Sequence, residues 1–125
     1  MKYSDLTKKE VAKLEKVGVI NGCGVDGGIR PPKWLAIFFR DPCNQHDWEY
    51  EVGGTESDRI MSNVRFLIYL WSVTLKAKWY TVPIYFVIAN LFYFSVKIFG
   101  KKHFNHGKKK TKEEIFKQAD TRLHK

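Results

Sequence analysis

The segment 55–99 constrains the fold more than any other part of this chain. In its first half the apolar residues recur at helical spacing, at Ile60, Val64, Leu67, Leu70, Trp71 and Leu75. Such spacing marks one face of an α-helix. Thr55 is a favoured N-cap residue, and Pro83 interrupts the pattern. We therefore expect two long consecutive helices, at 56–80 and at 83–99.

The preceding residues predict two shorter helices. A basic amphipathic helix is expected over 5–18. A second is expected over 42–52, because Asp41 is a good N-cap, Pro42 suits the first helical position, and the pair Gly53-Gly54 stops a helix. A short apolar run lies between them, at 34–39.

Residues 101–125 are expected to form a loose basic tail with a short helix near 112–123. We find no internal repeat and no convincing strand. The sequence thus predicts an all-α fold, with one domain over 1–100 followed by the tail.

The composition favours an anionic partner. The 125 residues carry 22 Lys and Arg against 13 Asp and Glu, a formal charge of +9. Nucleic acid and anionic lipid both fit that charge, and the 15% aromatic content suits a membrane interface as well as a core. The charged N-terminus lacks the apolar region of a secretory signal, so the cellular location stays unknown.

The glycine-rich loop 21–28 has three interpretations. Gly22-Cys23-Gly24-Val25-Asp26-Gly27 formally matches a dinucleotide-binding motif, but Pro31-Pro32 follows where that motif needs a helix. A plain surface turn uses the same residues. A loop whose backbone carbonyls converge on a hard cation such as Ca²⁺ does so too. The loop alone does not choose between the last two.

Four polar side chains share one face of the 42–52 helix. Cys43, His46, Asp47 and Tyr50 stand at positions i, i+3, i+4 and i+7. A thiol, an imidazole, a carboxylate and a phenol therefore point into the same space. A satisfied polar network or a solvated face would give the same spacing, and so would a site for acid–base chemistry.

The loop and this helix together resemble the phospholipase A2 family. The pattern is Cys-x-x-His-Asp-x-x-Tyr after a Cys-Gly…Gly-Gly loop, and the stretch from His46 to Phe66 is similar to small bacterial and phage members. Parvoviral capsid phospholipases are similar more distantly. The resemblance covers roughly residues 21–66, less than half of the chain.

The resemblance implies calcium-dependent hydrolysis of the sn-2 ester of glycerophospholipids. His46 would be the general base that takes a proton from water. Asp47 would bind Ca²⁺ with backbone carbonyls of the loop, including those of Gly22, Gly24 and Gly27, and Ca²⁺ would act as a Lewis acid. Tyr50 would hydrogen-bond behind the base.

The family also implies a disulfide between Cys23 and Cys43, the two cysteines of this chain. Such a bond implies an oxidising place of action, and so export without a classical signal peptide.

Two departures from the family pattern stand out. The loop is one residue longer than the commonest form, so the carboxylate of Asp26 is a further candidate ligand. The family normally has an Asp that orients the base, and here Asp58 and Asn63 compete for that place. Asn63 shares its helix face with Leu67 and Leu70, whereas Asp58 lies about 140° away. We favour Asn63. An amide stabilises imidazolium less than a carboxylate does, so the sequence leaves open both an active enzyme and one with slow or absent turnover.

Residues 79–96 carry no charge, a length at the lower limit for crossing a bilayer. The simpler interpretation is a third helix packed on the two antiparallel helices that would carry the active site, 42–52 and 56–80, with an exposed aromatic side. Further contacts with an anionic phospholipid surface are expected from Trp34 and from basic residues of the 5–18 helix, Lys9, Lys13 and Lys16.

The basic tail gives little further signal. His103 and His106 lack a third metal ligand, and Lys108-Lys109-Lys110 belong to no recognisable nucleic-acid fold. Nucleic acid is thus not expected as a partner, and no protein partner is predicted. Three hypotheses follow: a phospholipase A2-type ester hydrolase, a non-catalytic lipid-binding module on the same scaffold, and a small membrane protein acting through 79–96.

Overall fold

A computed structural model describes residues 2–20 and 31–123, and over these residues the chain is mostly helical and forms no strand. The all-α class predicted from the sequence is thereby confirmed. The helices and the two 3-10 turns are, in order, η1 (Tyr3–Asp5), α1 (Lys8–Val17), α2 (Lys33–Phe38), α3 (Arg40–Val52), α4 (Glu56–Leu75), α5 (Val82–Phe99), η2 (Gly100–His103) and α6 (Lys112–Leu123).

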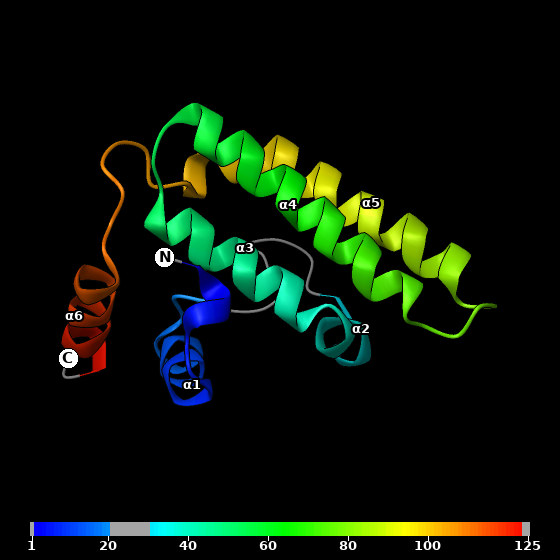
Figure 1. The fold of residues 1–125 in the computed structure, drawn as a ribbon, viewed down its shortest axis with the longest axis horizontal. Helices are drawn as coiled ribbons and strands as arrows, with labels where there is room; N and C mark the ends of the chain where they lie inside the picture. Colours follow the sequence, from blue (N-terminus) through cyan, green and yellow to red (C-terminus); the bar gives the residue numbers. More distant parts are fainter. Residues whose placement is uncertain (1, 21–30, 124–125) are drawn as a thin grey trace.

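Helix α3 occupies the middle of the molecule, and α4 runs between it and α5 (Figure 1). The helices α4 and α5 form a long antiparallel hairpin on one side. On the other side of α3 lie α1 and α6, which contact each other.

Two apolar clusters hold this arrangement, and α3 contributes to both. The first joins α2, α3, α4 and α5 through Leu35, Phe39, Cys43, Phe66, Leu70 and Ala89. The second joins α1, α3 and α6 through Leu14, Ile20, Trp48, Ile115 and Ala119. Cys43 and Trp48 are five positions apart, about 140° around the helix, so α3 can face the two clusters at once.

The N-terminal helix begins later than the 5–18 range predicted from the sequence. A 3-10 turn, η1, comes first, and α1 starts at Lys8 after a reciprocal capping box between Thr7 and Glu10. Each side chain of that box accepts a hydrogen bond from the other residue's backbone N–H, which fixes the start. Gly18 ends the helix in the left-handed conformation.

Helix α3 begins two residues earlier than predicted, at Arg40 rather than at Pro42, so Asp41 is not its N-cap. The residue before the helix is Phe39, which is fully buried in the first cluster. Packing therefore sets this start instead of a side-chain cap. Pro42 is tolerated because it falls in the first turn, where backbone N–H groups lack helical partners.

Helix α4 ends at Leu75, about a turn before the predicted end near Tyr80. The residues between Lys76 and Thr81 form turns instead, closed by the backbone bonds Lys76 N–H to Val73 O and Thr81 N–H to Lys78 O. Pro83 occupies the first turn of α5. The chain therefore has to reverse before Pro83, and the turn is formed by residues that were predicted to belong to the end of α4.

The expectation of a loose tail after Gly100 is wrong, although its helix at 112–123 is present. Phe104 is buried against Tyr50, and Ile115 and Ala119 are fully buried in the second cluster. These three apolar residues, spaced among lysines, pack this segment on α1 and α3, and ion pairs such as Lys110–Glu51 and Lys112–Glu10 add to the contact.

The junction between α3 and α4 is tied to the segment after α5. Gly54 donates its N–H to the carbonyl of Asn105, and its own carbonyl accepts from Gly107. Asn105 in turn donates to the carbonyl of Tyr50. The two ends of the α4–α5 hairpin are therefore joined by hydrogen bonds at the junction of α3 and α4.

Candidate active site

His46 and Asn63 meet at the buried contact between α3 and α4. His46 Nε2 lies 2.9 Å from Asn63 Oδ1. Both side chains are almost fully buried, 6% and 4% exposed. Asn63 reaches this place because it shares a buried face of α4 with Phe66 and Leu70, at i, i+3 and i+7.

Tyr50, one turn after His46 on α3, completes this contact. Its hydroxyl donates a hydrogen bond to the same Asn63 Oδ1 over 2.7 Å. The His46 ring lies between the rings of Tyr50 and Phe66, with centroid distances of 4.2 Å and 4.5 Å. The imidazole is thus fixed in position by two rings and oriented by one amide oxygen.

This geometry assigns the tautomer of His46. A carbonyl-type oxygen can only accept, so Nε2 carries the proton that Asn63 Oδ1 binds. The lone pair of the neutral imidazole is then on Nδ1, the atom available to take a proton. Burial lowers the pKa of His46 to about 4, and the hydrogen bond to Asn63 offsets only part of that effect. The imidazole is therefore neutral near pH 7.

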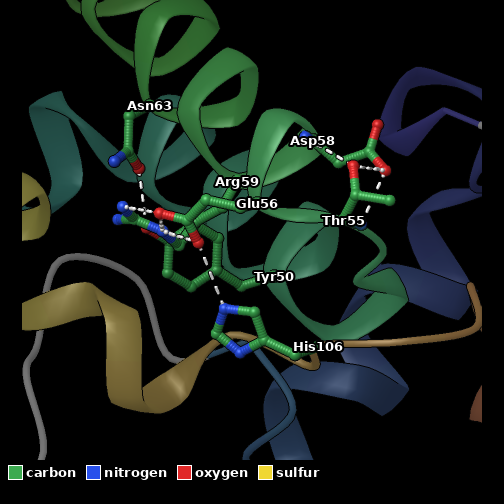
Figure 2. Close-up of polar contacts among 7 residues, drawn as sticks. All are labelled: Tyr50, Thr55, Glu56, Asp58, Arg59, Asn63 and His106. Atoms are coloured by element: carbon green, nitrogen blue, oxygen red, sulfur yellow. Dashed lines mark hydrogen bonds and ion pairs between the residues drawn. The ribbon is translucent and has the colours of Figure 1, made fainter.

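A chain of polar side chains continues from Asn63 to the surface (Figure 2). Beyond Tyr50 lies Arg59, which is 9% exposed and binds Glu56 through Nε at 3.1 Å. The Arg59 guanidinium lowers the pKa of Glu56 to about 2. His106 Nε2 lies 3.3 Å from the same carboxylate. The Tyr50 hydroxyl thus interacts with both the Asn63 amide oxygen and the paired guanidinium of Arg59, although its burial is the larger effect and raises its pKa.

Asp58, the other candidate for orienting the base, has a different role. Its carboxylate accepts the backbone N–H of Thr55 at 2.9 Å, and Thr55 Oγ1 accepts from the Asp58 N–H, which makes a capping box at the start of α4. Lys109 lies 3.6 Å from the same carboxylate. Figure 2 shows Asp58 and Thr55 apart from the Asn63–Tyr50 contact. Between the two candidates, the structure brings Asn63 to His46.

The remaining residues of the implied site divide between described and undescribed parts of the chain. Asp47 follows His46 on α3 and is half-buried. Cys43, one turn before His46, is buried and disulfide-bonded. The implied loop ligands and the second cysteine, Gly22, Gly24, Asp26, Gly27 and Cys23, lie outside the described residues.

The residues expected at a membrane interface lie on two helices and differ in their contacts. Lys9 and Lys16 are exposed on α1, but Lys13 pairs with Asp120 of α6 and lies over the Phe116 ring. Trp34 is exposed on α2, where its ring contacts Tyr85 of α5 edge-on at 6.3 Å. Trp34 therefore belongs with the α5 side of the molecule, and Lys13 with the contact between α1 and α6.

Sequence reasoning missed Arg59 as a neighbour of Tyr50 and Phe66 as a neighbour of the base. Both lie on the same α4 face as Asn63, one turn before it and nearly one turn after it, so the helical spacing alone could have found them. An arginine on a buried face requires a partner, and Glu56 at i−3 was the visible signal.

Comparison of the chain with protein-family models, with curated proteins and with solved structures gave no match in any of the three.

Proposed function

We propose that this protein hydrolyses the sn-2 ester of glycerophospholipids with calcium as its cofactor. The observation that carries the proposal is the buried contact of His46 Nε2 with Asn63 Oδ1, which leaves Nδ1 of a neutral imidazole as the proton acceptor. The disulfide at Cys43 and the resemblance of 21–66 to phospholipases A2 support the same function.

The chain's own residues divide the work as follows. His46 Nδ1 takes a proton from a water molecule as the water oxygen attacks the sn-2 carbonyl carbon, and returns it to the leaving glycerol oxygen when the ester bond breaks. Asn63 holds the ring by its Nε2–H, and Tyr50 fixes Asn63 from the other side. The products are a lysophospholipid and a fatty acid.

The donor chemistry of Asp47 fits a calcium ion. A carboxylate on the same helix face as the base is the oxygen donor that this hard cation prefers. Over the described residues, no group of three or more His, Cys, Asp or Glu side chains gathers, so the other ligands would be the loop carbonyls that the resemblance implies. When bound, calcium would supply Lewis-acid polarisation of the ester carbonyl.

The test is fatty-acid release from sn-2-labelled anionic vesicles, with calcium and with chelator. We expect release that needs calcium and falls at least about a hundredfold in His46→Gln, in line with loss of a general base. The matched control is His103→Gln, the same substitution at an exposed histidine outside the site, which should release fatty acid at the native rate. Full turnover in His46→Gln would contradict the mechanism.

A second candidate is a lipid-binding module without turnover, which one specific observation favours. Asn63 is an amide, and burial lowers the pKa of His46 to about 4, so imidazolium is poorly stabilised during any proton transfer. Vesicle binding without fatty-acid release, under oxidising conditions with calcium present, would select this candidate.

A further inference from the structure

Helix α5 has a free apolar side along its whole length. Five large residues recur at alternating three- and four-residue intervals and are each between 52% and 67% exposed: Ile84, Val87, Leu91, Phe94 and Ile98. They form one line on the helix, which we call the α5 ridge, about 21 Å long at 1.5 Å per residue. Ala89, on the opposite side, is fully buried in the cluster shared with α4.

A helix that is apolar on all sides is normally buried in a core or in a membrane. Within Val82–His103 an 18-residue window has a mean hydropathy of 1.7, which makes this the one helical segment among the described residues long and apolar enough to cross a bilayer, yet only 6% of that window is buried. In this structure α4 covers one side of α5. The ridge on the other side therefore requires a partner.

The charges around the ridge match an anionic lipid surface. No charged residue lies within 79–96, and exposed lysines stand on both sides of that interval: Lys76 and Lys78 before it, and Lys97, Lys101 and Lys102 after it. Trp79 and Tyr80, 84% and 57% exposed, stand at the N-terminal end, and such rings favour the headgroup region. Lysines at both ends can reach lipid phosphates while the ridge is covered by acyl chains.

A second copy of the chain fits the ridge less well. The spacing is that of a coiled-coil seam, but α5 has 18 residues, fewer than the three to four heptads, or about 21 to 28 residues, that such seams usually need. The positions beside the ridge, such as Phe86, Asn90 and Ser95, carry no charges to choose a partner helix. Hydrocarbon, which needs no such pairing, is the better cover.

The packing of α4 sets the orientation of α5. Helix α4 lies alongside α5 and carries Glu56, Asp58, Arg59 and Arg65. If α5 crossed the bilayer with α4 still attached, these charges would enter the hydrocarbon, which is costly. A helix lying in the plane of the interface avoids that cost.

We infer that α5 is a docking element that lies in the plane of an anionic phospholipid surface. The ridge enters the boundary between headgroups and acyl chains, the lysines at both ends bind lipid phosphates, and α4 with the rest of the molecule stays on the aqueous side. The inference rests on the proposed function only for the identity of the partner, phospholipid, and not on catalysis.

The first test measures binding to vesicles of diether phosphatidylglycerol and diether phosphatidylcholine, whose sn-2 position cannot be hydrolysed. The full chain is compared with the double variant Leu91→Glu/Phe94→Glu in a flotation assay. We expect the vesicle partition coefficient to fall about a hundredfold or more, because two apolar contacts are replaced by charges repelled by the lipid. Leu123→Glu, at an exposed site on α6 across the molecule from α5 (Figure 1), should bind like the native chain.

The second test measures depth. A fluorescent amino acid is placed singly at Ile84, Leu91 or Ile98, and its quenching by lipids brominated at different acyl positions is compared. Equal shallow depth at the three positions is the expected result. A probe at Leu91 much deeper than the other two would show a spanning helix and overturn the in-plane assignment.

Two further outcomes would overturn the inference. Unchanged vesicle binding in Leu91→Glu/Phe94→Glu would exclude the ridge as the contact. A lipid-free dimer in sedimentation that this variant dissociates, without vesicle binding by the native chain, would assign the ridge to a second copy. Because diether lipids remove hydrolysis from the assay, binding here with no release from ester lipids would reject the proposed function alone.

Discussion

Burial determines the protonation of His46. The folded chain holds the pKa of this imidazole at about 4, against about 6.5 for an unperturbed histidine, because the ring is packed between Tyr50 and Phe66. Between these two values the unfolded chain binds a proton that the folded chain does not. The contribution of His46 to the free energy of unfolding is therefore fully present above about pH 6.5. It is lost as the pH falls towards 4, which lowers the stability by up to about 3 kcal/mol.

Replacing the imidazole should remove this pH dependence. In His46→Gln, the free energy of unfolding should change with pH by about 3 kcal/mol less than in the native chain between pH 7 and pH 4. Denaturant titrations in chelator, at several pH values in that range, measure the difference. Equal slopes in the two proteins would mean that His46 titrates normally in the fold.

An aspartate at position 63 should restore the stronger base. In Asn63→Asp, a carboxylate beside Nε2 raises the pKa of His46 and stabilises imidazolium, so sn-2 hydrolysis should rise about tenfold or more. The acidic limb of the pH–rate profile should also move to higher pH, because the base is protonated at a higher pH. Asn63→Leu is the matched loss-of-contact variant and should be slower than the native chain. A rate in Asn63→Asp at or below the native one would reject this role for Asn63.

At the residue scale the sequence predicted much of the described site but not the environment that tunes it. Helical spacing placed Cys43, His46, Asp47 and Tyr50 on one face, and in the structure Cys43, His46 and Tyr50 are buried whereas Asp47 is half-buried. The same spacing favoured Asn63 over Asp58, and Asn63 is the residue that lies beside His46. The link from Arg59 through Glu56 to His106 was not predicted. It brings together residues some fifty positions apart, which local periodicity does not reveal.

Among the elements, the junction of α3 and α4 is the most constrained. Gly53 has a φ of +79°, and a Cβ there would lie 2.0 Å from the backbone oxygen of Asn105. Glycine is therefore required twice over, by conformation and by space. The sequence predicted this helix end correctly, because Gly53-Gly54 follows the last helical residue.

A pair of glycine substitutions separates the two requirements. Gly18→Ala places a side chain at a φ of +81° with nothing within 4 Å, so it should cost about 1 kcal/mol of folding stability. Gly53→Ala adds a clash with backbone that must move, and should cost clearly more, about 3 kcal/mol or above. Urea unfolding of both variants gives the comparison. Equal losses of folding stability in the two variants would show that the backbone at Asn105 shifts at little cost to make room for the new Cβ.

Element boundaries were predicted less well than element existence. Asp41 has the properties of an N-cap, but burial of Phe39 places the start of α3 earlier in the chain, at Arg40. The residues up to Tyr80 were predicted to continue α4, but after Leu75 they form the turn that reverses the chain into α5. At the start of α3 a contact between distant segments overrode a local preference, and at the end of α4 the turn before Pro83 did so.

On the scale of the whole molecule, the segment after Gly100 completes the second cluster. Its basic composition suggested a tail, and the few apolar residues that anchor it, Phe104, Ile115 and Ala119, are diluted among lysines. The helix was therefore predicted, but its packing on α1 and α3 was not. The average composition of the segment hides the few apolar residues whose burial holds it in place.

Ile115 should therefore matter for global stability. Ile115→Ala leaves a cavity between α1, α3 and α6, and should lower the free energy of unfolding by about 2 to 5 kcal/mol. Leu123→Ala, a partly exposed site on the same helix, should cost less than about 1 kcal/mol. Chemical unfolding of the two variants measures both. A small loss in Ile115→Ala would mean that α6 contributes little to the fold.

The contact between α1 and α6 has a consequence for synthesis. Helix α1 leaves the ribosome early, whereas α6 leaves it only after α3, α4 and α5. Until then Leu14 and Trp48, both fully buried in the finished fold, lack the apolar partner that covers them. A nascent chain held short of Ile115 would present this surface to chaperones and proteases, so the second cluster closes only after α6 has been synthesised.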